Sequence, residues 1–230
     1  EFLVLGVDHA TRGAAVEAAI PPIRAAFAEE YPTVGGPGAE VGVGMSPRPV
    51  RAGGPPIWIG GSSKAAITRA ARLADGWLPI MFIPEKYHNV GGPQLKAGLA
   101  KRDPNRKRLD ISAGGMLAID ESLTGEARTK VLDMARPGMA LYVGGMGARG
   151  KNFYNDIACA YGYEKEAGEV QDLYLEGKKA EAAAALPGEW LELSHLVGPR
   201  SFIKERVAAF KEAGVTVLSV NPVGPNAVQQ

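Results

Sequence analysis

The sequence contains little cysteine, little excess charge and no long apolar run. Its single cysteine, Cys159, excludes a disulfide within the chain and fits a reducing compartment. Lys and Arg number 26 against 25 Asp and Glu, so no net charge would attract nucleic acid or an anionic membrane. No apolar stretch approaches the ~18 residues of a membrane-spanning helix, and the start lacks the basic and apolar regions of a signal peptide. We therefore expect a cytoplasmic protein without nucleic-acid or membrane partners.

Recognisable catalytic and metal-binding motifs are also absent. The three histidines, His9, His88 and His195, show no metal-ligand spacing, and we interpret each as a surface or hydrogen-bonded residue. The chain has no Ser-His-Asp order, no Walker-type Gly-Lys-Ser/Thr and no His-Glu-x-x-His. The motifs of metal-dependent, serine-hydrolase and nucleotide-hydrolase chemistry are therefore missing from the sequence.

What the chain does contain is a core-forming composition and one complete βαβ unit. With 230 residues, 46% of them hydrophobic, it can bury a core as a single domain, 1–230. Within residues 55–79, the apolar run 57–59 is typical of a buried parallel strand, and a second strand begins at Trp77. The helix predicted between them places apolar residues at three- and four-residue spacing, namely Ala66, Ile67, Ala70, Ala71 and Ala74.

The turn between the first strand and this helix has phosphate-binding chemistry. Gly60 and Gly61 let the backbone approach a ligand closely, and a helix N-terminus presents free N–H groups with a partial positive charge. Ser62 or Ser63 can cap the helix by accepting a hydrogen bond from one of those amides. The alternative is a tight turn that needs glycine only for its backbone angles. The four residues alone favour neither interpretation.

The longer sequence around this turn resembles a known family. Residues 56–63 and 69–79 resemble the fifth-strand to sixth-strand region of the bacterial-luciferase-like flavin and deazaflavin oxidoreductases, particularly members that use coenzyme F420. The resemblance covers nearly the whole chain in order, and its other matches are Leu5-Gly6-Val7-Asp8, Arg12-Gly13, Ser46-Pro47-Arg48-Pro49-Val50, Val197-Gly198-Pro199 and Gly214-Val215-Thr216. It implies a TIM (β/α)8 barrel of the luciferase-like type. We expect this chain to be the barrel's C-terminal half to two-thirds, with a helical insertion at about 124–198 before the last strand.

The resemblance also implies a cofactor, a site and a reaction. The cofactor would be F420, with FMN as the alternative, and the reaction would be hydride transfer between the deazaflavin and an organic substrate. The cofactor-binding residues would be Gly60, Gly61, Ser62, Ser63, Pro79 and Met81. We interpret the neighbouring Trp77 and Leu78 as barrel core. The residues that assist proton transfer in this family lie mostly on its first strands, so we name no catalytic acid or base in this chain.

The substrate and the assembly are predicted less directly. Sugar-phosphate-oxidising relatives carry a threonine and a lysine just past the second strand, where this chain has Ile-Met-Phe-Ile at 80–83. The missing polar groups favour an apolar or weakly polar small-molecule substrate. Two alternatives stay open, an FMN-dependent luciferase-like monooxygenase and a non-catalytic flavin-binding or incomplete barrel fragment. We expect a homodimer, because a partial barrel would leave sheet edges and apolar surface unpaired.

The remaining segments are predicted from periodicity and from the positions of Gly and Pro. We expect helix over 14–30 that either kinks or divides into two short helices at Pro21-Pro22. Gly91-Gly92-Pro93 interrupts the helical segment 85–101, so we expect its helix to begin at about Pro93. The other predicted features are a short strand at 40–45, a solvated basic turn at 102–108, strands at 109–119 and 215–221, and a helix burying Ile203, Val207 and Phe210. In the insertion, Phe153 and Tyr154 either close over a flat ring system or are buried between helices.

Overall fold

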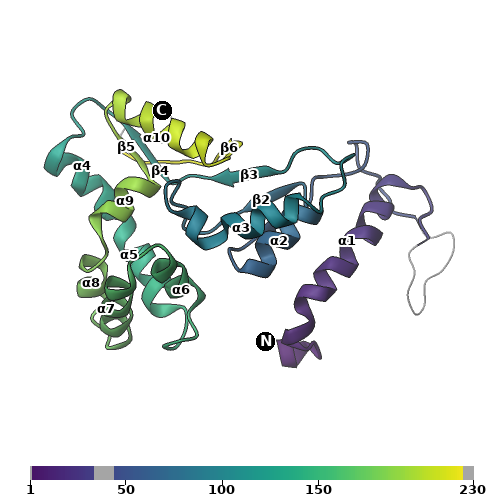
Figure 1. Cartoon of the computed structure of the whole chain (residues 1–230), viewed down its shortest axis with the longest axis horizontal. Helices are drawn as coiled ribbons and strands as arrows, with labels where there is room; N and C mark the ends of the chain where they lie inside the picture. The colour runs from purple at the N-terminus through teal and green to yellow at the C-terminus, as the bar shows by residue number, and fades with distance from the viewer. Residues whose placement is uncertain (1, 34–43, 225–230) are drawn as a thin grey trace.

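The computed structural model describes residues 2–33 and 44–224 (Figure 1). The strands are β1 (Trp58–Gly60), β2 (Gly76–Leu78), β3 (Asp110–Ala113), β4 (Met116–Ile119), β5 (Leu196–Gly198), β6 (Val217–Leu218) and β7 (Asn221–Pro222). The α-helices are α1 (Arg12–Ala28), α2 (Lys64–Leu73), α3 (Tyr87–Leu99), α4 (Gly125–Leu132), α5 (Arg136–Ala140), α6 (Phe153–Ala160), α7 (Glu164–Leu175), α8 (Lys179–Ala184), α9 (Gly188–Ser194) and α10 (Arg200–Glu212). The strands run across the middle of Figure 1, with the insertion helices α5–α8 at one end and α1 at the other. The predicted strand at 40–45 falls largely outside the described residues.

All strand pairs are parallel, in the orders β1-β2-β3-β6 and β5-β4-β7. The strands predicted at 109–119 and 215–221 are each divided in two, because Gly114 and Gly115 bend the first of them. The register nevertheless stays constant across the bend, with Ser112 opposite Val217 and Met116 opposite Asn221. Backbone hydrogen bonds bridge the break, from Ser219 N to Ala113 O at 3.0 Å and from Asn221 N to Gly115 O at 2.9 Å. Parallel strands joined through covering helices form part of a (β/α)8 barrel, as predicted.

β5 corrects the predicted position of the insertion. The sequence predicts that the helical insertion is followed directly by the last strand. In the structure, Leu196–Gly198 forms a further strand that pairs with β4, and α10 then leads to β6. β2 and β5 therefore lie on the same side of the chain segment 110–119, β2 beside its first half and β5 beside its second. A three-residue strand directly between a helix and a Gly-Pro sequence is too short to show a strand period.

The α2–α3 contact explains why α3 begins earlier than predicted. α3 runs continuously through Gly91-Gly92-Pro93, so a start near Pro93 is wrong. A Cβ on Gly98 would lie 2.6 Å from Ala71 Cβ and 2.7 Å from Thr68 O, and one on Gly91 would collide with Ile67 Cδ1. These glycines let the two helices pack closely over the buried residues of α2, and this packing outweighs their low helix propensity.

α10 and the sheet edges show which surfaces the described fold leaves open. On α10, Ile203, Arg206 and Phe210 are buried whereas Val207 is 40% exposed. The buried face of this helix therefore includes Arg206 in place of the predicted Val207.

β1 and β6 are the outer strands of the four-stranded sheet, and neither has a second partner among the described residues. Val217 on β6 is accordingly 41% exposed. Within the described ranges, none of the helices is long and apolar enough to cross a membrane.

α1 is one continuous helix, so the kink or division predicted at Pro21-Pro22 does not end it. Two sets of ion pairs attach it to the α2 region, one on each side of the prolines. Glu17 pairs with Arg69 Nε at 3.2 Å and with Arg72, and Arg24 Nη2 lies 2.9 Å from Asp75. These contacts help offset the backbone hydrogen bonds that the prolines remove.

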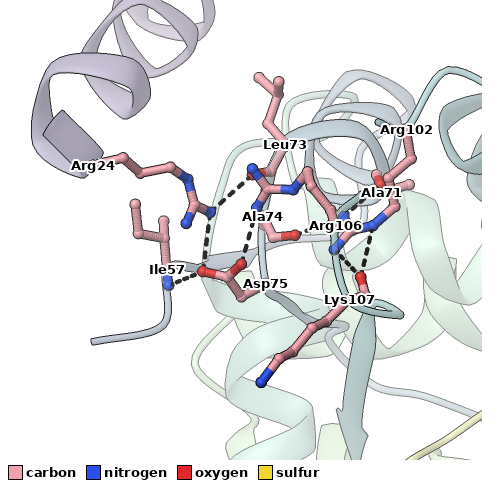
Figure 2. Close-up of polar contacts among 9 residues, drawn as sticks. All are labelled: Arg24, Ile57, Ala71, Leu73, Ala74, Asp75, Arg102, Arg106 and Lys107. Atoms are coloured by element: carbon pink, nitrogen blue, oxygen red, sulfur yellow. Dashed lines mark hydrogen bonds and ion pairs between the residues drawn. The ribbon is translucent and has the colours of Figure 1, made fainter. Parts of the chain in front are cut away.

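Asp75, just before β2, is the centre of a charged cluster (Figure 2). Its carboxylate accepts hydrogen bonds from Ile57 N at 2.7 Å, from Arg24 Nη2 at 2.9 Å and from Arg106 Nη2 at 2.9 Å. Burial would raise the pKa of Asp75, but the Ile57 amide and the two guanidinium groups hold it below its ordinary value. Arg102 donates to the backbone carbonyls of Ala71, Ala74 and Lys107. The turn 102–108 is therefore only partly solvated, contrary to its prediction.

We expect Asp75→Asn to lower the free energy of unfolding by about 3 kcal/mol at pH 7, because two of the three hydrogen bonds to the carboxylate are lost and such bonds to charged groups contribute ~1.5–3 kcal/mol each. A lowered pKa in the folded state means that this stabilisation is present above the unfolded-state value of about 3.9 and is lost as the pH falls below it. Urea unfolding at pH 7 and pH 3 checks this. A gap between wild type and variant that stays constant down to pH 3 would contradict the assignment.

Candidate functional site

The predicted phosphate turn is fixed to the end of β2 by three hydrogen bonds. Gly61 N donates to Leu78 O at 3.0 Å, and Ile80 N donates to Ser62 Oγ at 3.0 Å. The indole Nε1 of Trp77 donates to Gly61 O at 2.8 Å. The structure thus brings the two segments that carry the predicted site residues, 60–63 and 79–81, side by side at the C-terminal ends of β1 and β2. In a barrel enzyme this is the end that carries the active site.

The backbone of this turn is arranged to receive an anion. Ser63 caps α2 by accepting a hydrogen bond from Ala66 N at 3.2 Å, so the cap is Ser63 and not Ser62. Among the described residues, no partner is found for the N–H groups of Ser62, Ser63, Lys64 and Ala65. Gly61 has a φ of +105°, a conformation that a side chain would strain. The turn therefore offers several free amides at a helix N-terminus, the arrangement that suits a phosphate.

Met81, also predicted at the site, has an unusual backbone. Its φ is +52°, and it is the only non-glycine residue with a positive φ in the described part of the chain. Such a conformation costs of order 1–3 kcal/mol and is concentrated at functional sites. Pro79, Ile80 and Met81 are all half-buried, which leaves part of each side chain accessible. Met81 is thus a strained residue directly beside the phosphate turn.

The other apolar residues around β2 divide between core and surface. Trp77 is buried against α2, as predicted for core, but Leu78 is 43% exposed. Phe82 and Ile83 are buried, so they pack into the core and do not line a cavity. The predicted apolar character of the substrate site therefore depends on Leu78, Ile80 and Met81.

The insertion reaches the segment that follows β2. Ile83 N donates to Tyr161 Oη at 3.3 Å, and burial raises the pKa of Tyr161, so its hydroxyl stays neutral. Met81 and Phe153 pack against the same buried cluster of insertion residues. The ring of Tyr154 lies 5.3 Å from that of Phe153 and 4.8 Å from that of Tyr142. Phe153 and Tyr154 are partly buried and Tyr142 is 41% exposed, so these rings pack against one another while part of their surface stays accessible. A role of Phe153 and Tyr154 in covering a flat ring system stays a prediction.

A Lys-Tyr-Glu contact in the same region is not visible in the sequence. Lys86 Nζ lies 2.7 Å from Tyr163 Oη, and that hydroxyl donates to Glu189 Oε2 at 2.8 Å. Burial would lower the pKa of Lys86, but its hydrogen bonds to Tyr163 and Glu189 raise it. Tyr163 also stacks on Trp190, with ring centroids 5.4 Å apart. Because the three polar residues are far apart in sequence, only the folded chain reveals that they join the β2–α3 loop to the insertion.

None of the hydrogen bonds found at the phosphate turn involves a histidine or the cysteine. His195 precedes β5, and its Nδ1 accepts a hydrogen bond from Met116 N at 3.3 Å, where β4 and β5 begin. Cys159 is partly buried, and burial raises the pKa of its thiol. Residues 2–33 and 44–224 contain no group of three or more His, Cys, Asp or Glu side chains that could hold a metal ion. No catalytic acid or base is assigned in this chain.

Comparison with known proteins adds the family. The model of the luciferase-like monooxygenase family matches residues 1–217. The chain belongs to this family. A member protein of Mycobacterium tuberculosis, named as a candidate coenzyme F420-dependent oxidoreductase, is 32% identical over 165 residues, which cover 72% of this chain and 46% of that protein. The chain thus spans about half the length of this curated relative.

Solved structures similar to this luciferase-like chain show the same fold. A coenzyme F420-dependent tetrahydromethanopterin reductase from Methanopyrus kandleri matches with a TM-score of 0.66 and 19% identity, over 97% of this chain and 60% of that one. An F420-dependent secondary alcohol dehydrogenase matches with a TM-score of 0.61 and 15% identity, over 99% and 62%. A riboflavin lyase, solved with modified FMN and riboflavin, matches with a TM-score of 0.59 and 12% identity, over 99% and 57%. The partial barrel is therefore confirmed.

Proposed function

We propose that this chain is the cofactor-binding part of an F420-dependent oxidoreductase. It would transfer a hydride between the deazaflavin and an apolar or weakly polar organic substrate. The observation that carries the proposal is the row of free amides from Ser62 to Ala65, next to the strained Met81. Membership of the luciferase-like family and the F420-related name of the mycobacterial relative support the choice of cofactor.

The residues present fit a phosphate-bearing cofactor. The free N–H groups of the turn would hold the phosphate, and the absent side chains at Gly60 and Gly61 leave the approach to them open. When bound, the deazaflavin supplies the hydride chemistry. The half-buried Pro79, Ile80 and Met81 would form an apolar wall that keeps water from the reacting atoms. The hydrogen bond between Ile80 N and Ser62 Oγ would keep that wall at a fixed distance from the phosphate site.

The substrate class follows from the side chains beside this turn. Leu78, Ile80 and Met81 present apolar atoms, and none of them can hydrogen-bond a sugar hydroxyl or pair with a phosphate. An apolar wall favours apolar substrates over polar ones, because each Å² of apolar surface that the substrate buries against it contributes about 25 cal/mol to binding. This supports an apolar or weakly polar substrate over a phosphorylated sugar.

FMN is the second candidate cofactor. It also carries a phosphate, and the riboflavin lyase of similar fold was solved with modified FMN. With FMN, the chain would be part of a luciferase-like monooxygenase. The free amides of the turn do not distinguish the two cofactors, because both would place a phosphate on the same N–H groups.

A fluorescence titration of the chain with F420 and, separately, with FMN tests the proposal. We expect Gly61→Asp to weaken F420 binding by at least about tenfold, because one like charge within 4 Å of a phosphate costs ~1 kcal/mol or more and adds to the altered turn. Gly61→Asn is the matched control, since it has nearly the same size and the same backbone strain without the charge. The difference between the two variants isolates the phosphate contact.

The outcomes separate the three interpretations. F420 binding that weakens more in Gly61→Asp than in Gly61→Asn supports the proposed function. A preference for FMN with the same difference between variants supports the monooxygenase. Binding of neither cofactor would show that the chain lacks a competent site and would favour the non-catalytic partial barrel.

A further inference from the structure

A second candidate site, lined by charged side chains, lies at the opposite ends of β1 and β2 from the phosphate turn. A cleft of about 380 Å³ opens where β1, β2 and β3 begin, and the residues that matter for its chemistry are Arg24, Arg51, Trp58, Arg106, Lys107 and Arg108. Asp75 and Asp110 also line it. At about 3.3 Å per residue, the four steps along the chain from Asp75 to Pro79 separate this cleft from the cofactor turn by about 13 Å.

The charges in this cleft do not cancel. Five cationic side chains line it against two carboxylates. Asp75 is already engaged by Arg24, Arg106 and the Ile57 amide, and Asp110 accepts a hydrogen bond from Thr216 Oγ1 at 2.9 Å. An excess of three positive charges therefore remains in one concave surface of a chain whose net charge is only +1.

The uncompensated charges belong to Arg51, Lys107 and Arg108. Their side chains are exposed and have no hydrogen-bond or ion-pair partner among the described residues. Figure 2 shows the Lys107 ammonium free, while its backbone carbonyl accepts two hydrogen bonds from Arg102. Three unpaired cations that repel one another are the arrangement that a multiply charged anion would stabilise.

The segments that carry these cations are held in place. Arg102 fixes the turn before β3 through the Lys107 carbonyl, at 2.7 and 3.1 Å. On the other wall, Gly54 N donates to Arg51 O at 2.9 Å, and Gly53 and Gly54 have φ values of +78° and +80°. A Cβ on Gly54 would overlap the ring of Phe27 of α1, so the loop packs closely on that helix. A fixed frame reduces the ordering cost that binding an anion would otherwise carry.

We propose that this cleft binds a small multivalent oxyanion of the phosphate or diphosphate class. The three unpaired cations, on two fixed walls, match an anion with two to four negative charges. The site is distinct from the cofactor turn, because it uses charged side chains at the opposite ends of the strands. Guanidinium groups bind phosphate oxygens bidentately, and two of the three unpaired cations are arginines.

Isothermal titration with pyrophosphate at constant ionic strength tests this. We expect saturable binding that Arg51→Gln weakens about fivefold and that Lys107→Gln with Arg108→Gln weakens about 25-fold, since each exposed charge near 4 Å contributes ~1 kcal/mol. These side chains are exposed and unpaired, so the variants should fold. Lys204→Gln is the matched control, because Lys204 is an exposed, unpaired cation on α10. Gly61→Asp tests whether pyrophosphate binds at the cofactor turn.

Binding that is weakened by the cleft variants and unchanged in both Lys204→Gln and Gly61→Asp supports the proposal. Three results would overturn it. The first is the absence of saturable binding, and the second is binding lost in Gly61→Asp but retained in the cleft variants. The third is tighter, strongly salt-dependent binding of a DNA oligonucleotide to the same cations, which would identify a nucleic-acid surface.

Discussion

Replacing Gly114 with alanine is expected to lower the free energy of unfolding by about 3 kcal/mol or more, the upper range for overpacking a close backbone contact. A Cβ at this position would lie 2.8 Å from the carbonyl carbon of Ser219 and would overlap its oxygen. Both atoms belong to the backbone and cannot move aside as a flexible side chain would. Ser219 N also donates to Ala113 O, so separating the strands would break the ladder.

Urea unfolding followed by circular dichroism measures this effect. Gly168→Ala in α7 is the matched control, since a Cβ there has nothing within 4 Å and alanine is a better helix former by ~0.8–1 kcal/mol. We expect the control to be as stable as the wild type or slightly more stable. A Gly114→Ala protein with unchanged stability would show that the strands are not paired across the bend.

The importance of Gly114 follows from the topology. The chain segment 110–119 pairs with β2 and β5 on one side and with β6 and β7 on the other. Its partners β6 and β7 lie more than 100 residues away in sequence. The bend at Gly114 is therefore the place where the four-stranded sheet continues into the three-stranded one. A defect there would separate the insertion and β5 from the βαβ unit.

The βαβ unit could be predicted because its signals are local. The apolar run at 57–59, the glycine turn and the alanine-rich helix lie within 25 residues, and each agrees with the others. The cap at Ser63 and the burial of Trp77 follow from the same stretch. The glycine turn and helix N-terminus at 60–63 were found in this way, whereas Pro79 and Met81 were predicted only from the resemblance to the family.

The features that the sequence did not predict depend on contacts between distant segments. Gly91-Gly92-Pro93 suggests a helix break unless the close packing of Gly91 and Gly98 against α2 is known. The Asp75 cluster joins residues from four separate stretches, so the engaged arginines of the turn 102–108 could not be told from its solvated cations. The positive φ of Met81 likewise has no local signal, because methionine has no preference for that conformation.

His195 is the feature from which we expect the largest pH effect. It is mostly buried, its Nδ1 accepts a hydrogen bond from Met116 N, and its Nε2 is buried without a partner among the described residues. Burial lowers its pKa from 6.5 to about 4, and a backbone interaction with Ser194 opposes this shift only in part. Protonation at Nδ1 would also break the bond to Met116. The folded chain thus holds this histidine neutral.

A lowered histidine pKa means that the unfolded chain binds the extra proton first. The stabilisation by neutral His195 is therefore complete above pH 6.5 and is lost as the pH falls from 6.5 to about 4. At 1.36 kcal/mol per pKa unit, we expect a loss of about 3 kcal/mol over this range. His195→Gln keeps a hydrogen-bond acceptor but cannot titrate, so its stability should fall less between pH 6.5 and 4.5, whereas the exposed His9→Gln should behave as wild type. Urea unfolding at half-unit pH steps measures the slopes, and equal slopes for wild type and His195→Gln would contradict the burial of a neutral histidine.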